Sequence, residues 1–246
     1  MTTLNVLSRL MDYPTVDLID HQVDLLEAVQ AMSLSKKVRT QLMQFVRTRT
    51  EADLDDWQSE YDGLFEKGRS LSLLLFEHVH GESRDRGQAM VDLLAQYRTA
   101  GLELSQRELP DYLPLFLEFL STQGAVNARE GLAEISPVLA VLACRLEHRK
   151  SNYDVLFHAL LELADVRVNL DELRTTVRGE ERDDTRAALD KVWEEEAVTF
   201  GPGDAQDACG TGTSKPSEQQ RRDQYIPLNL PEDASQRPAA LQEDKA

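Results

Sequence analysis

Cysteine is nearly absent from this sequence, and the residues that break helices or build strands are also few. Cys144 and Cys209 lie far apart and neither belongs to a C-x-x-C pair, so the chain lacks the pattern of a disulfide scaffold, a structural zinc site or an iron–sulfur cluster. Glycine (12) and proline (9) are sparse among 246 residues, and aromatic residues make up 6%. Leucine, alanine and glutamate are abundant, and this composition favours helices over strands.

Positive charge and long hydrophobic runs are scarce as well. The 27 Lys and Arg residues face 44 Asp and Glu residues, which gives a formal net charge of −17. A surface of that sign repels phosphate backbones and anionic lipid headgroups, so we expect no nucleic-acid partner. The first residues lack the basic and apolar regions of a secretory signal, and no apolar run approaches the ~20 residues that span a bilayer. We therefore expect a cytoplasmic protein without membrane insertion.

Apolar residues recur at helical spacing along most of the chain. Leu4, Leu7 and Leu10 form the first stripe, and similar stripes follow at intervals that short joints separate. Pro110 suits the first turn of one helix, and Ser136 with Pro137 suits a joint between two others. The pattern predicts helices over residues 4–11, 16–29, 36–46, 54–66, 84–100, 110–120, 126–134, 137–149, 153–164, 170–177 and 185–198. The expected fold is all-α, a single irregular bundle of about ten helices.

The composition changes beyond Phe200. Glycine, proline, serine, glutamine and charged residues dominate there, and large apolar side chains are few. Such a segment cannot bury enough surface to offset the entropy of ordering its backbone. We therefore predict one helical domain over residues 1–200 and a disordered acidic tail over residues 201–246.

The sequence contains no GxGxxG, P-loop or GxSxG motif, so catalysis has no visible anchor. The best metal candidate is the set His78, His80 and Glu82. On a helix, residues two apart point roughly 200° away from each other, so one ion would need this stretch to be extended. A metal-dependent hydrolase using these three residues is one alternative function, against the plainer interpretation of polar residues at a helix end.

Two segments carry more apolar surface than one packing face requires. Residues 71–76 are apolar almost all round, and residues 113–120 present two apolar faces. The surplus either closes the protein's own core or forms a groove for an apolar or amphipathic segment of a partner. The sequence leaves both readings open.

Residues 61–94 closely resemble the signature of the delta subunits of respiratory nitrate reductases, which are molybdenum-cofactor assembly chaperones. The likeness continues through residues 107–115, 131–142 and 181–196. Its signature residues here are Glu77, His78, His80, Glu82, Arg84, Asp85, Arg86, Glu108 and Pro110.

The wider family of redox-enzyme maturation chaperones carries an E-x-P-D-H motif before an apolar helix. Glu108-Leu109-Pro110-Asp111-Tyr112 occupies that motif here. Tyr112 stands where the wider family usually has histidine, so no role of that histidine transfers to this chain.

The resemblance implies an all-helical chaperone with no turnover and no cofactor of its own. The implied partner is the catalytic (alpha) subunit of a respiratory nitrate reductase, bound through its N-terminal peptide. The chaperone would keep that subunit open to molybdenum-cofactor insertion and delay its docking on the membrane subunit; cofactor-insertion proteins are further candidate partners. A generic helical scaffold is a third hypothesis, after the chaperone and the metal-dependent hydrolase. Our hypothesis for the peptide site takes apolar contacts and acidic partners from Leu73, Phe76, Asp111, Tyr112, Phe116, Glu118 and Phe119.

Overall fold

The computed structural model describes residues 2–81, 83, 85–104 and 108–196, with the backbone alone for 192–196. In this part of the chain the regular structure is helical, apart from one isolated bridge between Leu74 and Tyr112. The predicted all-α bundle is confirmed, and the predicted tail over 201–246 lies outside the described residues. The helices are α1 (Thr3–Met11), α2 (Val16–Asp20), α3 (Gln22–Gln30), α4 (Lys36–Thr50), α5 (Leu54–Tyr61), the π-helical η1 (Asp62–Glu66), α6 (Leu75–Val79), α7 (Asp85–Thr99), α8 (Leu113–Thr122), α9 (Ala125–His148), α10 (Asp154–Ala164), α11 (Leu170–Val177) and α12 (Arg186–Glu196).

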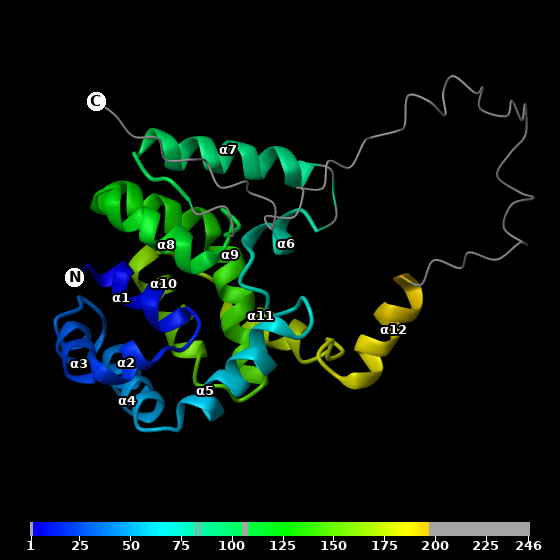
Figure 1. Ribbon diagram of the computed structural model, residues 1–246, viewed down its shortest axis with the longest axis horizontal. Helices are drawn as coiled ribbons and strands as arrows, with labels where there is room; N and C mark the ends of the chain where they lie inside the picture. The colour runs from blue at the N-terminus through cyan, green and yellow to red at the C-terminus, as the bar shows by residue number, and fades with distance from the viewer. Residues whose placement is uncertain (1, 82, 84, 105–107, 197–246) are drawn as a thin grey trace, which may run out of the picture. The chain divides into compact units, whose positions relative to one another are not determined.

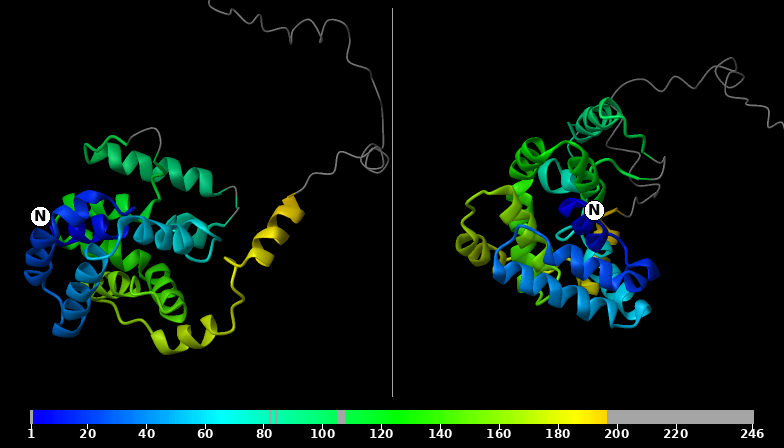
Figure 2. Two further views of the ribbon diagram at one scale, coloured as in Figure 1. Left: turned by 60° about the horizontal axis from the view of Figure 1, so that its bottom comes forward. Right: turned by 90° about the vertical axis from the view of Figure 1, so that its left-hand side faces the viewer.

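The long helix α9 organises the bundle. Helices α8, α10 and α11 pack on it, and α1 packs against α8, α3 and α10 (Figures 1 and 2). Helix α4 joins α3 to α10, while α7 lies outside α8 at the edge of the bundle. None of the described helices is long and apolar enough to cross a bilayer.

An aromatic cluster closes the core between α4, α5 and α10. Trp57 Nε1 donates a hydrogen bond of 2.6 Å to the Tyr153 hydroxyl, so the polar end of each ring is satisfied although both are buried. The Arg49 guanidinium lies 4.8 Å from the centroid of the Tyr153 ring and donates to both carboxylate oxygens of Glu60. The N-terminal helices are thereby fixed to α10.

Helix α9 runs without a break through Pro137, where the sequence predicted a joint between two helices. A proline removes the N–H that would bond the carbonyl four residues earlier, which is that of Ala133. The Ser136 hydroxyl donates to this carbonyl at 2.8 Å instead. The joint was predicted wrongly because a neighbouring side chain replaces the lost backbone donor. The opposite difference occurs near the N-terminus: the sequence predicted one helix over residues 16–29, and the structure divides it at His21 into α2 and α3.

The apolar segment 71–74 is not helical, and neither is the stretch around Pro110. The two segments cross as antiparallel backbone: Leu113 N–H donates to the Leu73 carbonyl at 2.8 Å, and Leu75 N–H donates to the Asp111 carbonyl at 2.9 Å. Helix α8 therefore begins after the crossing, with Pro114 rather than Pro110 in its first turn. The crossing fixes where α6 begins and where α8 begins.

The side chain of Asp111 completes the crossing. It is 0% exposed, and its Oδ2 accepts the Phe76 N–H at 3.0 Å, which caps α6 from 35 residues away. Leu74, at the N-cap position, has no side-chain acceptor to offer. Burial raises the pKa of the Asp111 carboxyl above its ordinary value, against the opposing effects of the Phe76 N–H and the nearby Arg86. Asp111 is thus a structural residue, not one exposed to a ligand.

Removal of this cap should destabilise the fold. Asp111→Ala leaves the Phe76 N–H without its acceptor, and we expect the free energy of unfolding to fall by about 1–3 kcal/mol. Asp111→Asn keeps an acceptor oxygen and removes a buried charge, so it should lose clearly less. Urea unfolding followed by circular dichroism measures both variants. Equal losses for the two variants would contradict a capping role.

Glu147 joins three helices by one carboxylate. From α9 it accepts two hydrogen bonds, of 2.7 and 2.9 Å, from Arg174 of α11, and it lies 2.8 Å from His158 Nε2 of α10. The Arg174 hydrogen bonds lower the pKa of Glu147 from its ordinary 4.5; burial opposes this shift and His158 adds to it. A carboxyl group whose pKa is lowered by folding stabilises the fold at pH values above its unfolded-state pKa. This contribution is lost as the pH falls through the folded-state pKa.

Glu147→Gln should therefore lower the free energy of unfolding at pH 7 by about 1–3 kcal/mol. The deficit relative to the unaltered chain should shrink as pH falls below 4.5, where the native carboxyl also loses its charge. Urea unfolding at pH 7 and at pH values below 4.5 tests this. Asp171→Asn is the control, because Asp171 pairs with the same arginine while its side chain is 93% exposed, and it should change stability by less than about 0.5 kcal/mol. A deficit that does not depend on pH would refute the linkage.

Candidate functional site

A groove opens between α7 and the pair α8 and α9, with α6 at one end. We call it the α7 groove; its cavity has a volume of about 740 Å³, within the range of ligand-binding clefts. The four helices contribute its lining: Leu75, Phe76, Val79, Ala89, Asp92, Leu93, Gln96, Phe116, Phe119, Leu120, Gln123, Asn127, Glu130, Gly131, Glu134, Ile135, Pro137 and Val138.

The floor of the α7 groove is apolar. Phe116 and Phe119 of α8 are each 8% exposed, so they contribute to both the core and the groove wall. Phe76 of α6 is half-buried and presents more of its ring. A Cβ added to Gly131 of α9 would lie 2.6 Å from Leu120 Cδ2, so a larger residue there would displace the Leu120 side chain in the groove lining.

Helix α7 forms the outer wall and is held mainly at two points. Leu93 and Tyr97 are its buried residues, and the Tyr97 hydroxyl donates to the Pro110 carbonyl at 2.7 Å. The Tyr97 and Phe119 rings pack with centroids 4.7 Å apart. Along the rest of α7 the side chains are exposed or half-buried, and Val91 is among the exposed apolar residues.

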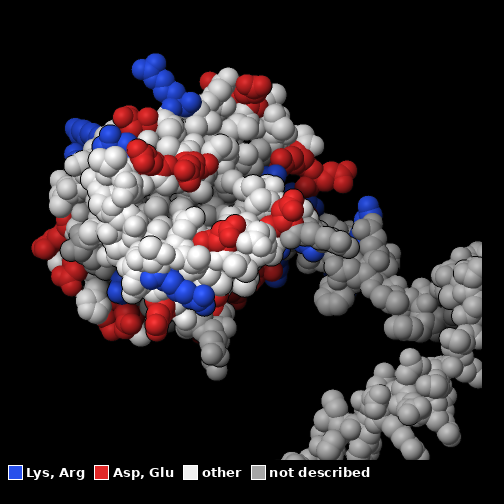
Figure 3. Space-filling view, turned by 90° about the horizontal axis from the view of Figure 1, so that it is seen from above, with Lys and Arg blue, Asp and Glu red and all other residues white. Residues whose placement is uncertain are grey.

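Carboxylates line the rim. Asp92 of α7 and Glu130 and Glu134 of α9 are exposed, and the described lining residues include no lysine or arginine. Figure 3, viewed from the side on which α7 lies, shows a broad uncharged area with groups of acidic side chains across it and Lys and Arg side chains mainly toward its edges. The α7 groove therefore suits an apolar segment that also carries positive charge.

The structure brings only some of the predicted peptide-site residues together. Phe76, Phe116 and Phe119 line the α7 groove. Leu73 is buried at the crossing, and Asp111 is buried beneath it. Glu118 is exposed but borders a separate hollow of about 350 Å³ beside Tyr97, Leu102 and Leu115.

Tyr112 takes part in a different arrangement. Its hydroxyl donates to Asp12 Oδ1 at 2.8 Å and lies 3.1 Å from the Tyr61 hydroxyl, which in turn lies 3.2 Å from the Met11 carbonyl. Burial raises the pKa of Tyr112. This residue ties the crossing to the end of α1 and to α5, and it does not line the α7 groove.

The signature residues also have structural partners. Glu77 lies 3.6 Å from Arg86, which links α6 to the first turn of α7, where Asp85 accepts from the Ser83 hydroxyl at 3.3 Å. His80 packs edge-on against the Phe76 ring, Pro110 is buried, and Glu108 is exposed. Glu82 and Arg84 lie outside the described residues. The contacts of Glu77, His80 and Arg86 therefore lie at the α6 end of the α7 groove.

His78 has a partner that argues against the metal-site alternative. Its Nε2 lies 2.8 Å from the Ser72 carbonyl, so this nitrogen carries the proton and donates. Burial lowers the pKa of His78. Within the described residues, the His, Asp and Glu side chains close enough to share an ion are Glu147, Asp154 and His158, and Arg174 already binds both oxygens of Glu147.

The residues that the sequence analysis missed are Asp92, Glu130 and Glu134. Glu130 and Glu134 are four residues apart and so lie on one face of α9, a spacing that was visible in the sequence. Which helix faces them was not visible. The placement of α7 depends on the crossing and on Tyr97, which join segments that the sequence pattern does not connect.

Comparison with known proteins identifies the family. The family model described as nitrate reductase delta subunit matches residues 31–159. The nitrate reductase molybdenum cofactor assembly chaperone NarJ of Escherichia coli (strain K12) is 52% identical over 201 residues, covering 81% of this chain and 85% of that protein. The probable nitrate reductase molybdenum cofactor assembly chaperone NarW of the same strain is 49% identical over 200 residues, covering 81% and 84%.

Among solved structures, a putative redox enzyme maturation protein from Archaeoglobus fulgidus is similar, with a TM-score of 0.46 and 19% identity over 66% of this chain and 92% of that chain. The sequence relatives cover most of the chain at high identity, and they decide the assignment. This chain belongs to the nitrate reductase delta subunit family.

Proposed function

We propose that this chain is an assembly chaperone that holds the N-terminal segment of the catalytic subunit of a respiratory nitrate reductase. Two relatives that match most of the chain are named as chaperones of molybdenum-cofactor assembly in nitrate reductase, which supports the chaperone function and the client. The observation that carries the binding mode is the α7 groove, with its apolar floor and acidic rim. The proposed place of action is the cytoplasm.

The groove fits an amphipathic helix better than a small molecule. Four helices line it, and its cavity of about 740 Å³ takes several apolar side chains rather than a whole helix. A helix laid across Phe76, Phe116 and Phe119 would insert apolar residues spaced three and four apart. Lysine or arginine on its flanks would then meet Asp92, Glu130 and Glu134, which fixes the direction of the bound segment.

Such binding accounts for the two parts of the proposed function without any catalysis by the chain. A client segment held in the groove is unavailable for its own contacts, so the apoenzyme stays open to cofactor insertion and its docking on the membrane subunit is delayed. Release of the segment would end both effects. A generic scaffold is less well supported, since relatives with a named client match most of this chain.

The first test is a calorimetric titration of the full chain with a synthetic peptide of the client's N-terminal residues. We expect binding, and we expect Phe76→Ala to weaken it by about tenfold, since a tenfold change corresponds to 1.4 kcal/mol and aromatic anchors commonly contribute that much. Phe76 is the preferred residue because it is half-buried. Phe116→Ala would instead cost about 3–5 kcal/mol of stability, since Phe116 is a core residue as well.

Leu115→Ala is the matched control for Phe76→Ala. Leu115 is also a half-buried apolar residue, but it borders the hollow beside Tyr97 and not the α7 groove. It should leave peptide affinity within about twofold of the unaltered chain, which corresponds to less than 0.5 kcal/mol. The absence of binding tighter than tens of micromolar would disprove the proposed function, and an equal loss for both variants would disprove the location.

The acidic rim gives a second prediction. Glu130→Gln with Glu134→Gln should weaken peptide binding by roughly tenfold at low salt, since each exposed pair contributes about 0.2–1 kcal/mol. The effect should fade near 1 M salt, where the screening length is about 3 Å. Glu118→Gln, an exposed carboxylate outside the groove, should have little effect at either salt concentration. A larger effect of Glu118→Gln would favour the site that the sequence alone predicted.

A further inference from the structure

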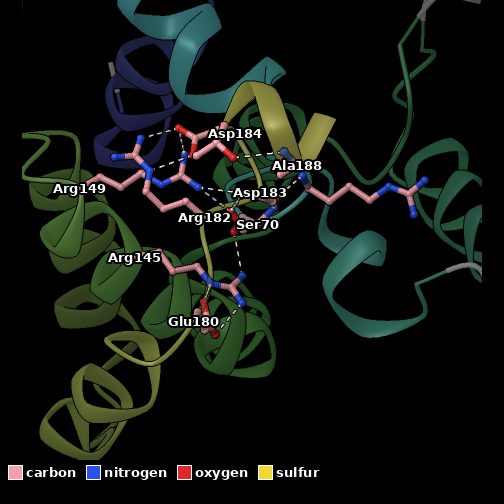
Figure 4. A network of polar contacts seen from close by, with 10 residues as sticks. Ser70, Arg145, Arg149, Glu180, Arg182, Asp183, Asp184 and Ala188 are labelled. Atoms are coloured by element: carbon pink, nitrogen blue, oxygen red, sulfur yellow. Dashed lines mark hydrogen bonds and ion pairs between the residues drawn. The ribbon is translucent and has the colours of Figure 1, made fainter. Parts of the chain in front are cut away.

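A second site lies at the turn of residues 68–70, beside the C-terminal end of α9. The α7 groove borders the N-terminal half of the same helix. The carboxylate of Asp183 sits in this turn and accepts four hydrogen bonds (Figure 4). Its Oδ2 accepts from the backbone N–H groups of Arg69 and Ser70 at 2.7 and 2.6 Å. Its Oδ1 accepts from the Ser70 hydroxyl at 2.5 Å and from an Arg149 Nη at 2.9 Å.

The backbone of this turn is shaped for an anion. Gly68 has φ +82°, and a Cβ there would lie 2.6 Å from both Cγ and Oδ2 of Asp183. Only glycine therefore combines this conformation with the close approach of an oxyanion. Two successive N–H groups that point into one concavity form a nest, an arrangement that binds phosphates and carboxylates in many proteins.

Buried arginine completes the donor set. The Arg149 side chain is 7% exposed, and its Nη1 lies 3.1 Å from Asp184 Oδ2 without making a hydrogen bond of good geometry. Arg145 donates to the Ser70 carbonyl at 2.8 Å and pairs with Glu180. A chain with a net charge of −17 thus gathers cationic and neutral donors at one point, and the carboxylates that meet them come from one short segment, 180–184.

That segment is attached by polar contacts. Val177 is buried, but none of residues 178–191 is. Burial would raise the pKa of Asp183, yet the hydrogen bonds from Ser70 and Arg69 outweigh it and lower that pKa below its ordinary value. The carboxylate is therefore charged at neutral pH, and its attachment depends on charge and hydrogen bonds. Interactions of this kind can be displaced by a competing anion, whereas a buried apolar contact cannot.

We propose that the Gly68–Ser70 turn with Arg149 is an oxyanion site for a phosphate group, and that Asp183 is its built-in occupant. A phosphate carries more charge than a carboxylate and has more oxygens for the same N–H, hydroxyl and guanidinium donors. When phosphate takes the cradle, Asp183 is displaced and the segment 180–191 loses four of the hydrogen bonds that attach it. The site is separate from the α7 groove and does not depend on the identity of the client.

The test uses inorganic phosphate and the full chain. Asp183→Ala empties the cradle, and we expect calorimetry to show phosphate binding at least tenfold tighter than to the unaltered chain, which corresponds to 1.4 kcal/mol or more. Glu181→Ala is the matched control, because it removes one charge from the same segment at an exposed position outside the cradle. Addition of Arg149→Gln to Asp183→Ala should abolish the gain.

A measurement on the unaltered chain decides the matter if Asp183→Ala does not fold. Hydrogen–deuterium exchange of residues 180–191 should speed up in phosphate compared with chloride at equal ionic strength. Equal exchange in the two salts would overturn the proposal, because simple screening would then explain any release. Equal phosphate affinity of Asp183→Ala and Glu181→Ala would overturn it as well.

Discussion

The antiparallel crossing of residues 73–75 with residues 111–113 is the constraint on which the rest of the structure depends. Two backbone hydrogen bonds and the buried Asp111 carboxylate hold together the segments around Leu74 and Tyr112, which are 38 residues apart in the chain. The part of the chain between them, which includes α6 and α7, forms a loop that the crossing closes. Because the crossing offsets the entropic cost of closing this loop, α7 needs few contacts of its own and can lie apart from α8 and α9. The α7 groove is the space that results.

The same crossing explains the structural role of the 108–112 motif in this chain. The Pro110 carbonyl accepts a hydrogen bond from the Tyr97 hydroxyl, and the Asp111 carboxylate caps α6. The Tyr112 hydroxyl donates to the Asp12 carboxylate. Three consecutive residues therefore anchor α7, α6 and α1. None of the three lines the α7 groove, yet together they determine where its walls stand. The motif thus holds the proposed binding groove in place without lining it.

The sequence predicted the all-α fold class, and it named three of the residues that line the α7 groove. Helical spacing of apolar residues identified most helices, because that pattern reflects local backbone geometry. It gave no indication that the apolar residues 71–74 have an extended backbone that pairs with a distant segment. It failed at Pro137 because the compensating donor, the Ser136 hydroxyl, acts through tertiary geometry that spacing does not encode.

The predicted peptide site differs from the lining of the α7 groove for a similar reason. Phe76, Phe116 and Phe119 were predicted for the site from surplus apolar surface, and the structure places all three along one groove. Asp111 and Glu118 were proposed as acidic partners because they lie next to these residues in sequence. Proximity along a helix says nothing about which neighbour faces the same cavity, and the carboxylates at the rim come from α7 and α9 instead.

The packing of arginines at the end of α9 also affects the electrostatic field around the molecule. Arg145 and Arg149 are each matched by carboxylates of the segment that covers them, so their charge cancels within a few ångströms. A cationic segment diffusing toward the chain meets the field of the remaining, mostly acidic surface without a strong local barrier from these two guanidinium groups. Such a field accelerates encounters between oppositely charged molecules. For the proposed function, neutralisation at one end of α9 would thereby favour rapid capture of a cationic segment at the α7 groove.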